Sequence, residues 1–195
     1  MLTFIAVIIC YLIGSLSSAT ILSKILNTPD PRKEGSGNAG ATNVLRTAGK
    51  KIAAYTVIGD AAKGIIAIII ARILGVHGAA LALLLFIVVL GHIFPVFFKF
   101  KGGKGVATAL GSMLALNPII ALASIIVWVV IAYITRYASL ASIIAIIANV
   151  VFSIAFGYAD IAFPLLLTAI LIVWKHKANI ERLIAGKESK IKIKM

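Results

Sequence analysis

Long, uninterrupted apolar runs dominate this chain, and only short polar segments separate them. A helix needs about 20 apolar residues to cross the hydrocarbon core of a bilayer, whereas a membrane barrel strand alternates apolar and polar residues. The runs therefore predict transmembrane helices. The predicted spans are Leu2–Leu26, Ile52–Leu74, Ala79–Phe98, Val106–Leu116, Pro118–Ile134, Ser139–Phe156 and Ile161–Trp174.

The fourth run, Val106–Leu116, has room only for a short or tilted span, and Asn117-Pro118 marks a turn after it. Five or six crossings are therefore the alternative to seven. We predict an all-α, polytopic integral membrane protein with about seven transmembrane helices. Residues 1–195 are expected to form a single transmembrane domain.

The composition supports this fold class. Hydrophobic residues make up 62% of the 195 positions, and the mean hydropathy is +1.11, whereas a soluble domain is roughly 45–50% apolar. No Lys or Arg precedes the first run, so we interpret it as a span rather than a signal peptide. Cys10 is the single cysteine, which excludes an intramolecular disulfide and a cysteine-based metal site. We expect no metal and no other cofactor.

The formal net charge of +13 is distributed unevenly along the chain. With seven crossings and the N-terminus outside, all but two of the 19 Lys and Arg residues fall at the inner side; the exceptions are Lys63 and Arg72. This bias predicts a cytoplasmic C-terminus. The inner side holds the longer segments, at about 27–51, 99–105, 136–142 and 175–195, so we expect an active site facing the cytoplasm. Basic residues gathered at a membrane surface favour lipid headgroups and anionic substrates over nucleic acid.

The segment from Glu34 to Arg46 is rich in glycine, asparagine, serine and threonine. Glycines let a main chain approach an anion closely, and we expect Thr42 or Asn43 to cap a following helix whose N-terminus attracts negative charge. The pattern predicts a phosphate site; a flexible connector is the alternative. A dinucleotide-binding fold is excluded, because a proline-containing segment rather than a strand precedes the glycines.

A second glycine segment surrounds Lys104 and leads into the predicted helix at Val106. It lacks the spacing of a nucleotide-hydrolysing P-loop, but it directs N–H groups and one cation at an anion. We interpret Lys99 and Lys101 as headgroup anchors. His92, about one turn inside the membrane boundary, is predicted to be a structural hydrogen-bonding group rather than a base.

Two further pairs carry polar chemistry. Asp60 and Lys63 are three residues apart in the second span, which predicts a buried ion pair, with bracing of the substrate loop as a further possibility. Ser139 and Ser142 lie one turn apart at the inner mouth of the sixth span. Their position is compatible both with capping that helix and with binding a substrate oxygen.

Three motifs in order along the chain resemble one family. They are Ser36–Arg46, then Gly91–Thr108, then His176–Leu183 followed by Gly186 and Glu188. Together they resemble the bacterial acyl-phosphate:glycerol-3-phosphate acyltransferases, the PlsY family. The resemblance implies an enzyme of the bacterial inner membrane that moves a fatty acyl group from acyl-phosphate to the 1-hydroxyl of glycerol 3-phosphate. Lysophosphatidic acid and phosphate are the implied products, in the first acylation step of phospholipid synthesis.

The resemblance also implies roles for individual residues. The residues expected to hold the acyl-phosphate head are Ser36, Gly37, Asn38, Gly40, Thr42 and Asn43. Those expected to bind glycerol 3-phosphate are Arg46, Lys104, His176 and Asn179, with Ser139 and Ser142 assisting. His176, Lys104 and Arg46 form the expected catalytic group. The hydroxyl proton goes either to His176 or to the substrate's own phosphate.

Two other function classes compete with this interpretation. A transporter of a phosphorylated metabolite also suits glycine loops and buried charges, but the sequence shows no inverted repeat and its basic residues gather at one face. A purely structural membrane protein is the second rival. The expected partners are acyl-phosphate, glycerol 3-phosphate and membrane lipids, and the sequence carries no signal for an oligomeric state.

Overall fold

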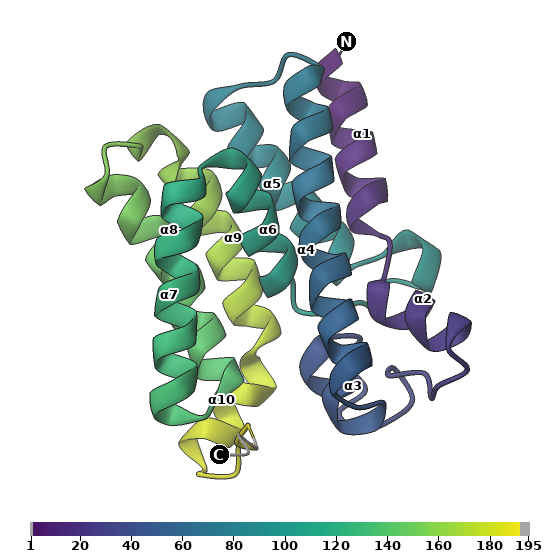
Figure 1. The fold of residues 1–195 in the computed structure, drawn as a ribbon. Helices are drawn as coiled ribbons and strands as arrows, with labels where there is room; N and C mark the ends of the chain where they lie inside the picture. Colours follow the sequence, from purple (N-terminus) through teal and green to yellow (C-terminus); the bar gives the residue numbers. More distant parts are fainter. Residues whose placement is uncertain (1, 192–195) are drawn as a thin grey trace.

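The computed structural model describes residues 2–191. Met1 and residues 192–195, which include Lys192 and Lys194 of the predicted inner tail, lie outside the described residues. Every regular element within the described range is a helix, as the sequence predicts (Figure 1). The helices are α1 (Leu2–Gly14), α2 (Ser18–Ile25), α3 (Ala41–Thr47), α4 (Lys50–Ile73), α5 (Gly78–Ile93), η1 (Val96–Phe98), α6 (Val106–Leu116), α7 (Pro118–Thr135), α8 (Ala138–Ala155), η2 (Ala159–Ile161), α9 (Ala162–Lys175) and α10 (Lys177–Ile184).

Four helical segments in the described range are long and apolar enough to cross a membrane: α4, α5 with η1, α7 and α8. The number rises to six if each of two bent helix pairs counts as one span. The shorter apolar helix α6 coincides with the predicted fourth run. The prediction of a helical, multi-pass membrane protein is therefore confirmed.

The first predicted span, Leu2–Leu26, is divided into two helices, α1 and α2, which bend by 46° at the break. Ser17 starts the second helix, because its hydroxyl accepts the N–H of Thr20 as an N-cap. The carbonyl of Leu16, left without a helical partner at the break, accepts a hydrogen bond from Lys63 at 2.6 Å. The hydropathy of the predicted span does not fall enough at the break for the sequence to reveal it.

Glycines allow the helices to cross closely. A Cβ atom added to Gly111 of α6 would lie 2.2 Å from the carbonyl oxygen of Ala61 in α4, and one added to Gly14 of α1 would lie 2.2 Å from that of Val88 in α5. No side chain fits at such distances, so these positions require glycine. The close α4–α6 crossing fixes the start of α6, where the second glycine segment ends.

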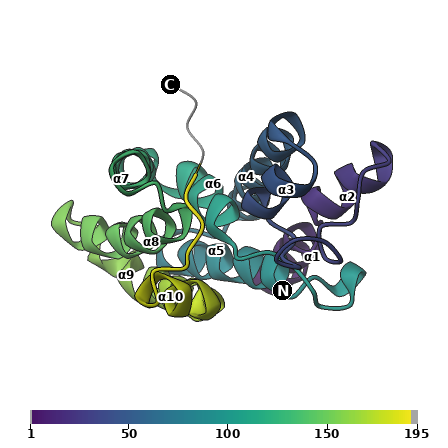
Figure 2. The ribbon, with the colours of Figure 1, turned by 90° about the horizontal axis from the view of Figure 1, so that it is seen from below.

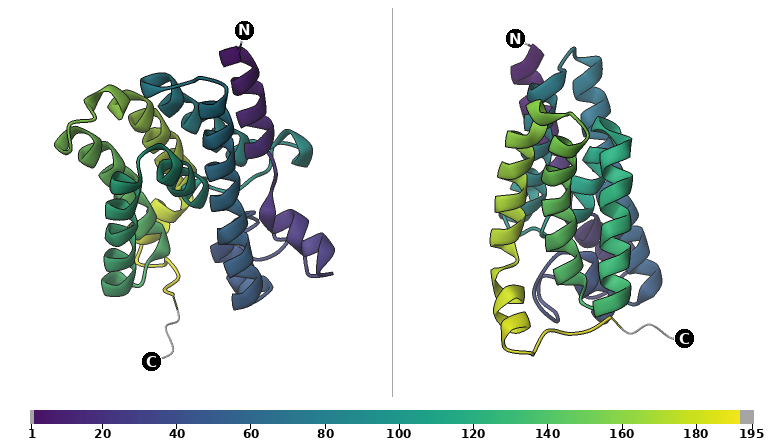
Figure 3. Two further views of the ribbon diagram at one scale, coloured as in Figure 1. Left: turned by 45° about the horizontal axis from the view of Figure 1, so that its top comes forward. Right: turned by 90° about the vertical axis from the view of Figure 1, so that its left-hand side faces the viewer.

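Two of the segments predicted to carry chemistry, the one around α3 and the one from α10 onward, lie at one end of the molecule (Figure 1). Helices α3 and α10 both lie at the lower end of Figure 1, and Figure 2 views the molecule from that end. The chain after α10 runs beneath α8, as Figure 3 shows, and the N–H of Ile191 donates to the carbonyl of Arg136 at 2.7 Å. Segments that are far apart in sequence thus share one surface.

Candidate functional site

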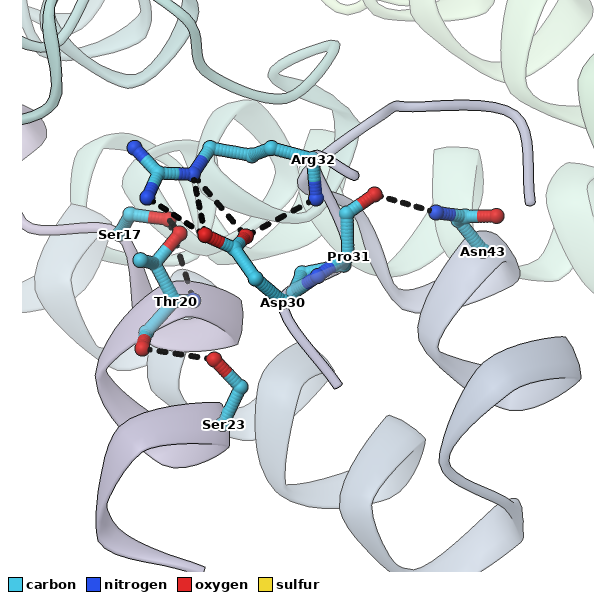
Figure 4. A network of polar contacts seen from close by, with 7 residues as sticks. All are labelled: Ser17, Thr20, Ser23, Asp30, Pro31, Arg32 and Asn43. Atoms are coloured by element: carbon cyan, nitrogen blue, oxygen red, sulfur yellow. Dashed lines mark hydrogen bonds and ion pairs between the residues drawn. The ribbon is translucent and has the colours of Figure 1, made fainter. Parts of the chain in front are cut away.

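The glycine loop, residues 34–40, is built around the side chain of Asn43 in α3. This buried amide accepts the N–H of Ser36 at 2.9 Å and donates to the carbonyls of Pro31, Glu34 and Asn38 at 2.7, 2.9 and 3.1 Å. Figure 4 shows Asn43 reaching the Pro31 carbonyl. Because both amide hydrogens and the oxygen are used within the loop, Asn43 shapes the loop rather than offering donors to a substrate.

Helix α3 begins without a side-chain cap. Gly40 is its N-cap residue, while Thr42 and Asn43 lie within the helix, so the expectation that one of them caps it is wrong. The first-turn N–H groups are therefore not covered by a capping side chain. Ser36, Gly37 and Thr42 are exposed beside this helix start.

An ion pair holds the entry to the glycine loop. The guanidinium of Arg32 forms a two-point contact with Asp30, with Nη2 2.7 Å from Oδ2 and Nε 3.0 Å from Oδ1 (Figure 4). The hydrogen bond from Arg32 lowers the pKa of Asp30. The same guanidinium lies over the ring of Phe98 at 5.6 Å from its centroid. The loop entry is thereby tied to η1, which precedes Lys104 in the chain.

Lys104 connects its own glycine segment to α10. Its ammonium donates to the side-chain oxygen of Asn179, whose nitrogen donates to Glu188 at 2.7 Å. Glu188 accepts and Lys104 donates, so the orientation of the Asn179 amide between them is fixed. Burial lowers the pKa of Lys104 to about 8; Glu188 opposes this shift, and the positive charges of Arg182 and Arg46 add to it.

Glu188 is the centre of this network. Besides Asn179, its carboxylate accepts from the Ser139 hydroxyl and from Nε of Arg182, each at 2.7 Å, and its side chain is only 5% exposed. Burial alone would raise the pKa of this carboxyl, but the hydrogen bonds from Asn179, Ser139 and Arg182 outweigh it and lower the pKa. The sequence motif contains Glu188, yet no local pattern revealed that α8 and α10 meet on it.

His176 lies between α9 and α10, where the chain bends by 60°. The ring is buried, and its Nδ1 is 2.8 Å from the carbonyl oxygen of Ile172. A carbonyl only accepts, so Nδ1 carries a proton and Nε2 is the nitrogen that remains for another partner. Arg46 is exposed in the last turn of α3.

The two serines of α8 have internal partners. Ser142 donates to the carbonyl of Ala138 at 2.7 Å and accepts from the indole of Trp128 at 3.0 Å, while Ser139 donates to Glu188. The N-cap of α8 is Tyr137, so the capping interpretation of both serines is wrong. Ser139 belongs to the Lys104 network, whereas Ser142 packs within its own helix pair.

The two glycine segments approach each other at Gly103. A Cβ atom added there would lie 3.1 Å from the carbonyl oxygen of Ala39, in the glycine loop. Three separate segments, the glycine loop, the Lys104 segment and α10, thus converge. Backbone N–H groups and fixed cations suit phosphate. Within residues 2–191 no group of three or more His, Cys, Asp or Glu residues is arranged to hold a metal ion.

The sequence matches the family described as glycerol-3-phosphate acyltransferase over residues 4–186. A glycerol-3-phosphate acyltransferase of Coxiella burnetii is 51% identical over 189 residues, which cover 97% of this chain and 98% of that protein. The corresponding protein of Burkholderia cenocepacia is 46% identical, over 96% of this chain and 90% of its own length.

Two solved structures have the same fold. They are crystal structures of PlsY (YgiH), an integral membrane glycerol 3-phosphate acyltransferase, in its glycerol 3-phosphate form and its lysophosphatidic acid form. Each has a TM-score of 0.89 and 42% sequence identity; both cover 97% of this chain, and the alignments cover 96% and 95% of the respective solved chains. With the family match spanning nearly the whole sequence, the chain belongs to the glycerol-3-phosphate acyltransferase family.

Proposed function

We propose that this protein transfers a fatty acyl group from acyl-phosphate to the 1-hydroxyl of glycerol 3-phosphate and releases lysophosphatidic acid and phosphate. The observation that carries the proposal is the convergence at Lys104: the residue before it contacts the glycine loop, and its ammonium bonds Asn179 of α10. The proposed donor and acceptor sites thereby meet at the Lys104 segment. The family membership and the glycerol 3-phosphate and lysophosphatidic acid forms of PlsY support the same reaction.

The proposed acceptor site lies on the α10 side. Lys104 and Arg46 neutralise the phosphate of glycerol 3-phosphate, while Asn179 and His176 orient the glycerol. Ser139 assists by holding Glu188, which keeps Asn179 turned toward Lys104. Ser142, with both bonds inside its helix pair, contributes to the shape of the site.

The proposed donor site is the glycine loop. The phosphate of acyl-phosphate binds the backbone and side-chain donors at Ser36, Gly37, Asn38, Gly40 and Thr42, and Asn43 holds these groups in place. The 1-hydroxyl oxygen attacks the acyl carbon, and the bond between that carbon and the phosphate oxygen breaks. The hydroxyl proton ends on the released phosphate, with Nε2 of His176 accepting its hydrogen bond during attack. An activated donor of this kind needs orientation and charge neutralisation above all.

The proposed topology has seven crossings, an outer N-terminus and a site facing the cytoplasm, in the inner membrane of a bacterium. Helix α6, with 11 residues, is only about 16 Å long and too short to cross by itself. We therefore propose that α6 is the short crossing of the seven, and that Gly105 packs its start against α5 below the cytoplasmic surface.

The test is an assay of the purified protein in detergent with acyl-phosphate and glycerol 3-phosphate. We expect lysophosphatidic acid and phosphate in equal amounts, and no product when acyl-CoA replaces acyl-phosphate. A transporter makes no product in a single compartment, so absence of lysophosphatidic acid contradicts the proposal and favours that rival.

Lys104→Ala and Lys101→Ala form a matched pair for the same assay. Lys104 contacts the site, whereas Lys101 is exposed and predicted to anchor at headgroups. We expect Lys104→Ala to lower kcat/KM by about 30- to 1,000-fold, or roughly 2–4 kcal/mol, and Lys101→Ala by less than about twofold. Equal effects would argue against a specific role for Lys104.

A further inference from the structure

A cluster of charged and polar side chains lies inside the helical bundle, beneath the two glycine segments. We call Asp60, Lys63, His92 and Thr108 the intramembrane cluster; its members come from α4, α5 and α6, and each is at most 6% exposed. The predicted ion pair is present, with Lys63 Nζ 3.1 Å from Asp60 Oδ1. None of these four residues belongs to the proposed substrate sites. Burying charged groups inside a membrane protein costs free energy, so we expect these residues to have a functional role.

The cluster fixes the His92 ring in one state. Nδ1 of His92 lies 2.9 Å from the ammonium of Lys63 and 3.1 Å from the hydroxyl of Thr108. An ammonium group only donates, so Nδ1 must be the acceptor and the ring proton lies on Nε2. Lys63 is itself held by Asp60 and by the carbonyl of Leu16. The ring therefore has a defined tautomer and a defined position.

His92 contacts the segment that carries Lys104. Its carbonyl accepts the N–H of Gly103 at 3.3 Å. A Cβ atom on Gly103 would lie 2.2 Å from Nε2 of His92 and 3.1 Å from the carbonyl oxygen of Ala39. Gly103 is thus enclosed between the ring and the glycine loop. Gly103 therefore connects the position of the His92 ring to those of the glycine loop and Lys104.

We propose that His92 is a positioning residue: the intramembrane cluster holds its ring against Gly103 and so sets the spacing between the donor and acceptor phosphate sites. This inference rests on the proposed function. It assigns to the buried Asp60–Lys63 ion pair the role of holding both glycine segments in place. Apolar side chains would fill the same space without the electrostatic cost. A fixed network of hydrogen bonds instead defines one geometry, which two neighbouring phosphate sites require.

The experiment compares His92→Leu with His92→Asn in the purified full-length chain, with KM measured for both substrates. Asparagine retains an oxygen that accepts from Lys63, whereas leucine does not. We expect both variants to raise both KM values by about tenfold, because neither keeps the ring that lies against Gly103, although His92→Asn retains an acceptor for Lys63. A purely structural role would reduce the amount of active protein, and hence apparent kcat, with KM unchanged; that result overturns the proposal.

Gly103→Ala tests the same contact from the other side. This test does not depend on whether His92→Leu folds. The added methyl group displaces the ring or the glycine loop, so we expect KM for both substrates to rise by at least about fivefold. Unchanged KM values in Gly103→Ala would contradict the positioning role. Failure of the proposed function is distinguishable, because the unsubstituted protein would then make no lysophosphatidic acid.

Discussion

Asn179 presents its side-chain oxygen to Lys104 and its side-chain nitrogen to Glu188, so one amide joins the cation of the site to a buried carboxylate. Asn179→Asp replaces the donor with a second carboxylate facing Glu188. We expect kcat/KM to fall by about 100-fold, because the new carboxylate is repelled by Glu188 and neutralises the Lys104 charge that the substrate phosphate needs. Steady-state kinetics with both substrates measure this effect. Activity near that of the unsubstituted protein would show that the amide orientation is unimportant.

The pH dependence of acceptor binding follows from Lys104. Burial lowers its pKa to about 8, so the ammonium form predominates below pH 8 and is lost as the pH rises through that value. The phosphate of glycerol 3-phosphate, with a second pKa of about 6, is predominantly doubly charged above about pH 7 and does not titrate near pH 8. We therefore expect KM for glycerol 3-phosphate to rise above about pH 8, by up to about tenfold per pH unit.

Lys104→Arg provides the control for this pH profile. A guanidinium stays charged to beyond about pH 12, so the rise in KM near pH 8 should disappear, whatever the absolute activity of the variant. A KM that rises identically in both proteins would assign the titration to another group.

Asn43→Ala removes the side chain that holds the glycine loop together. Four hydrogen bonds are lost, and we expect KM for acyl-phosphate to rise by about tenfold or more, with a smaller change for glycerol 3-phosphate. Thr47→Val is the matched control, because it removes one hydrogen bond within the same helix and keeps the methyl group that faces Gly35 of the loop. Equal shifts of both KM values in Asn43→Ala would argue against a separate donor site.

His176→Gln separates orientation from proton transfer. Glutamine accepts a hydrogen bond but does not take up a proton near neutral pH. If the proton ends on the released phosphate, KM for glycerol 3-phosphate should rise while kcat stays within about tenfold. A fall in kcat of about 1,000-fold, with loss of the pH dependence of kcat, would instead identify the imidazole as the base.

The sequence predicted the helices better than the contacts between them. Helix α6 coincides with its predicted run, because Gly105 and Asn117-Pro118 delimit the apolar residues. The sequence did not predict the break near Ser17, because one capping serine within an apolar run hardly changes the mean hydropathy of that run.

In the candidate site, too, residue types were readable from the sequence and contacts between segments were not. From residue types, the sequence predicted phosphate-binding chemistry at the glycine loop and Lys104, and this remains a prediction. The internal bonding of Asn43 and the convergence on Glu188 depend on contacts between distant segments. No local pattern encodes such contacts, so these two roles required the three-dimensional arrangement.

The central claim is that two phosphorylated molecules bind together where the glycine loop, the Lys104 segment and α10 meet. A structure of the protein with glycerol 3-phosphate and an acyl phosphonate, which cannot transfer its acyl group, tests it most directly. We predict the phosphonate in the glycine loop and the glycerol 3-phosphate oxygens within about 3 Å of Lys104 Nζ. Either ligand bound at the opposite end of the helices, or away from Lys104, would contradict the account.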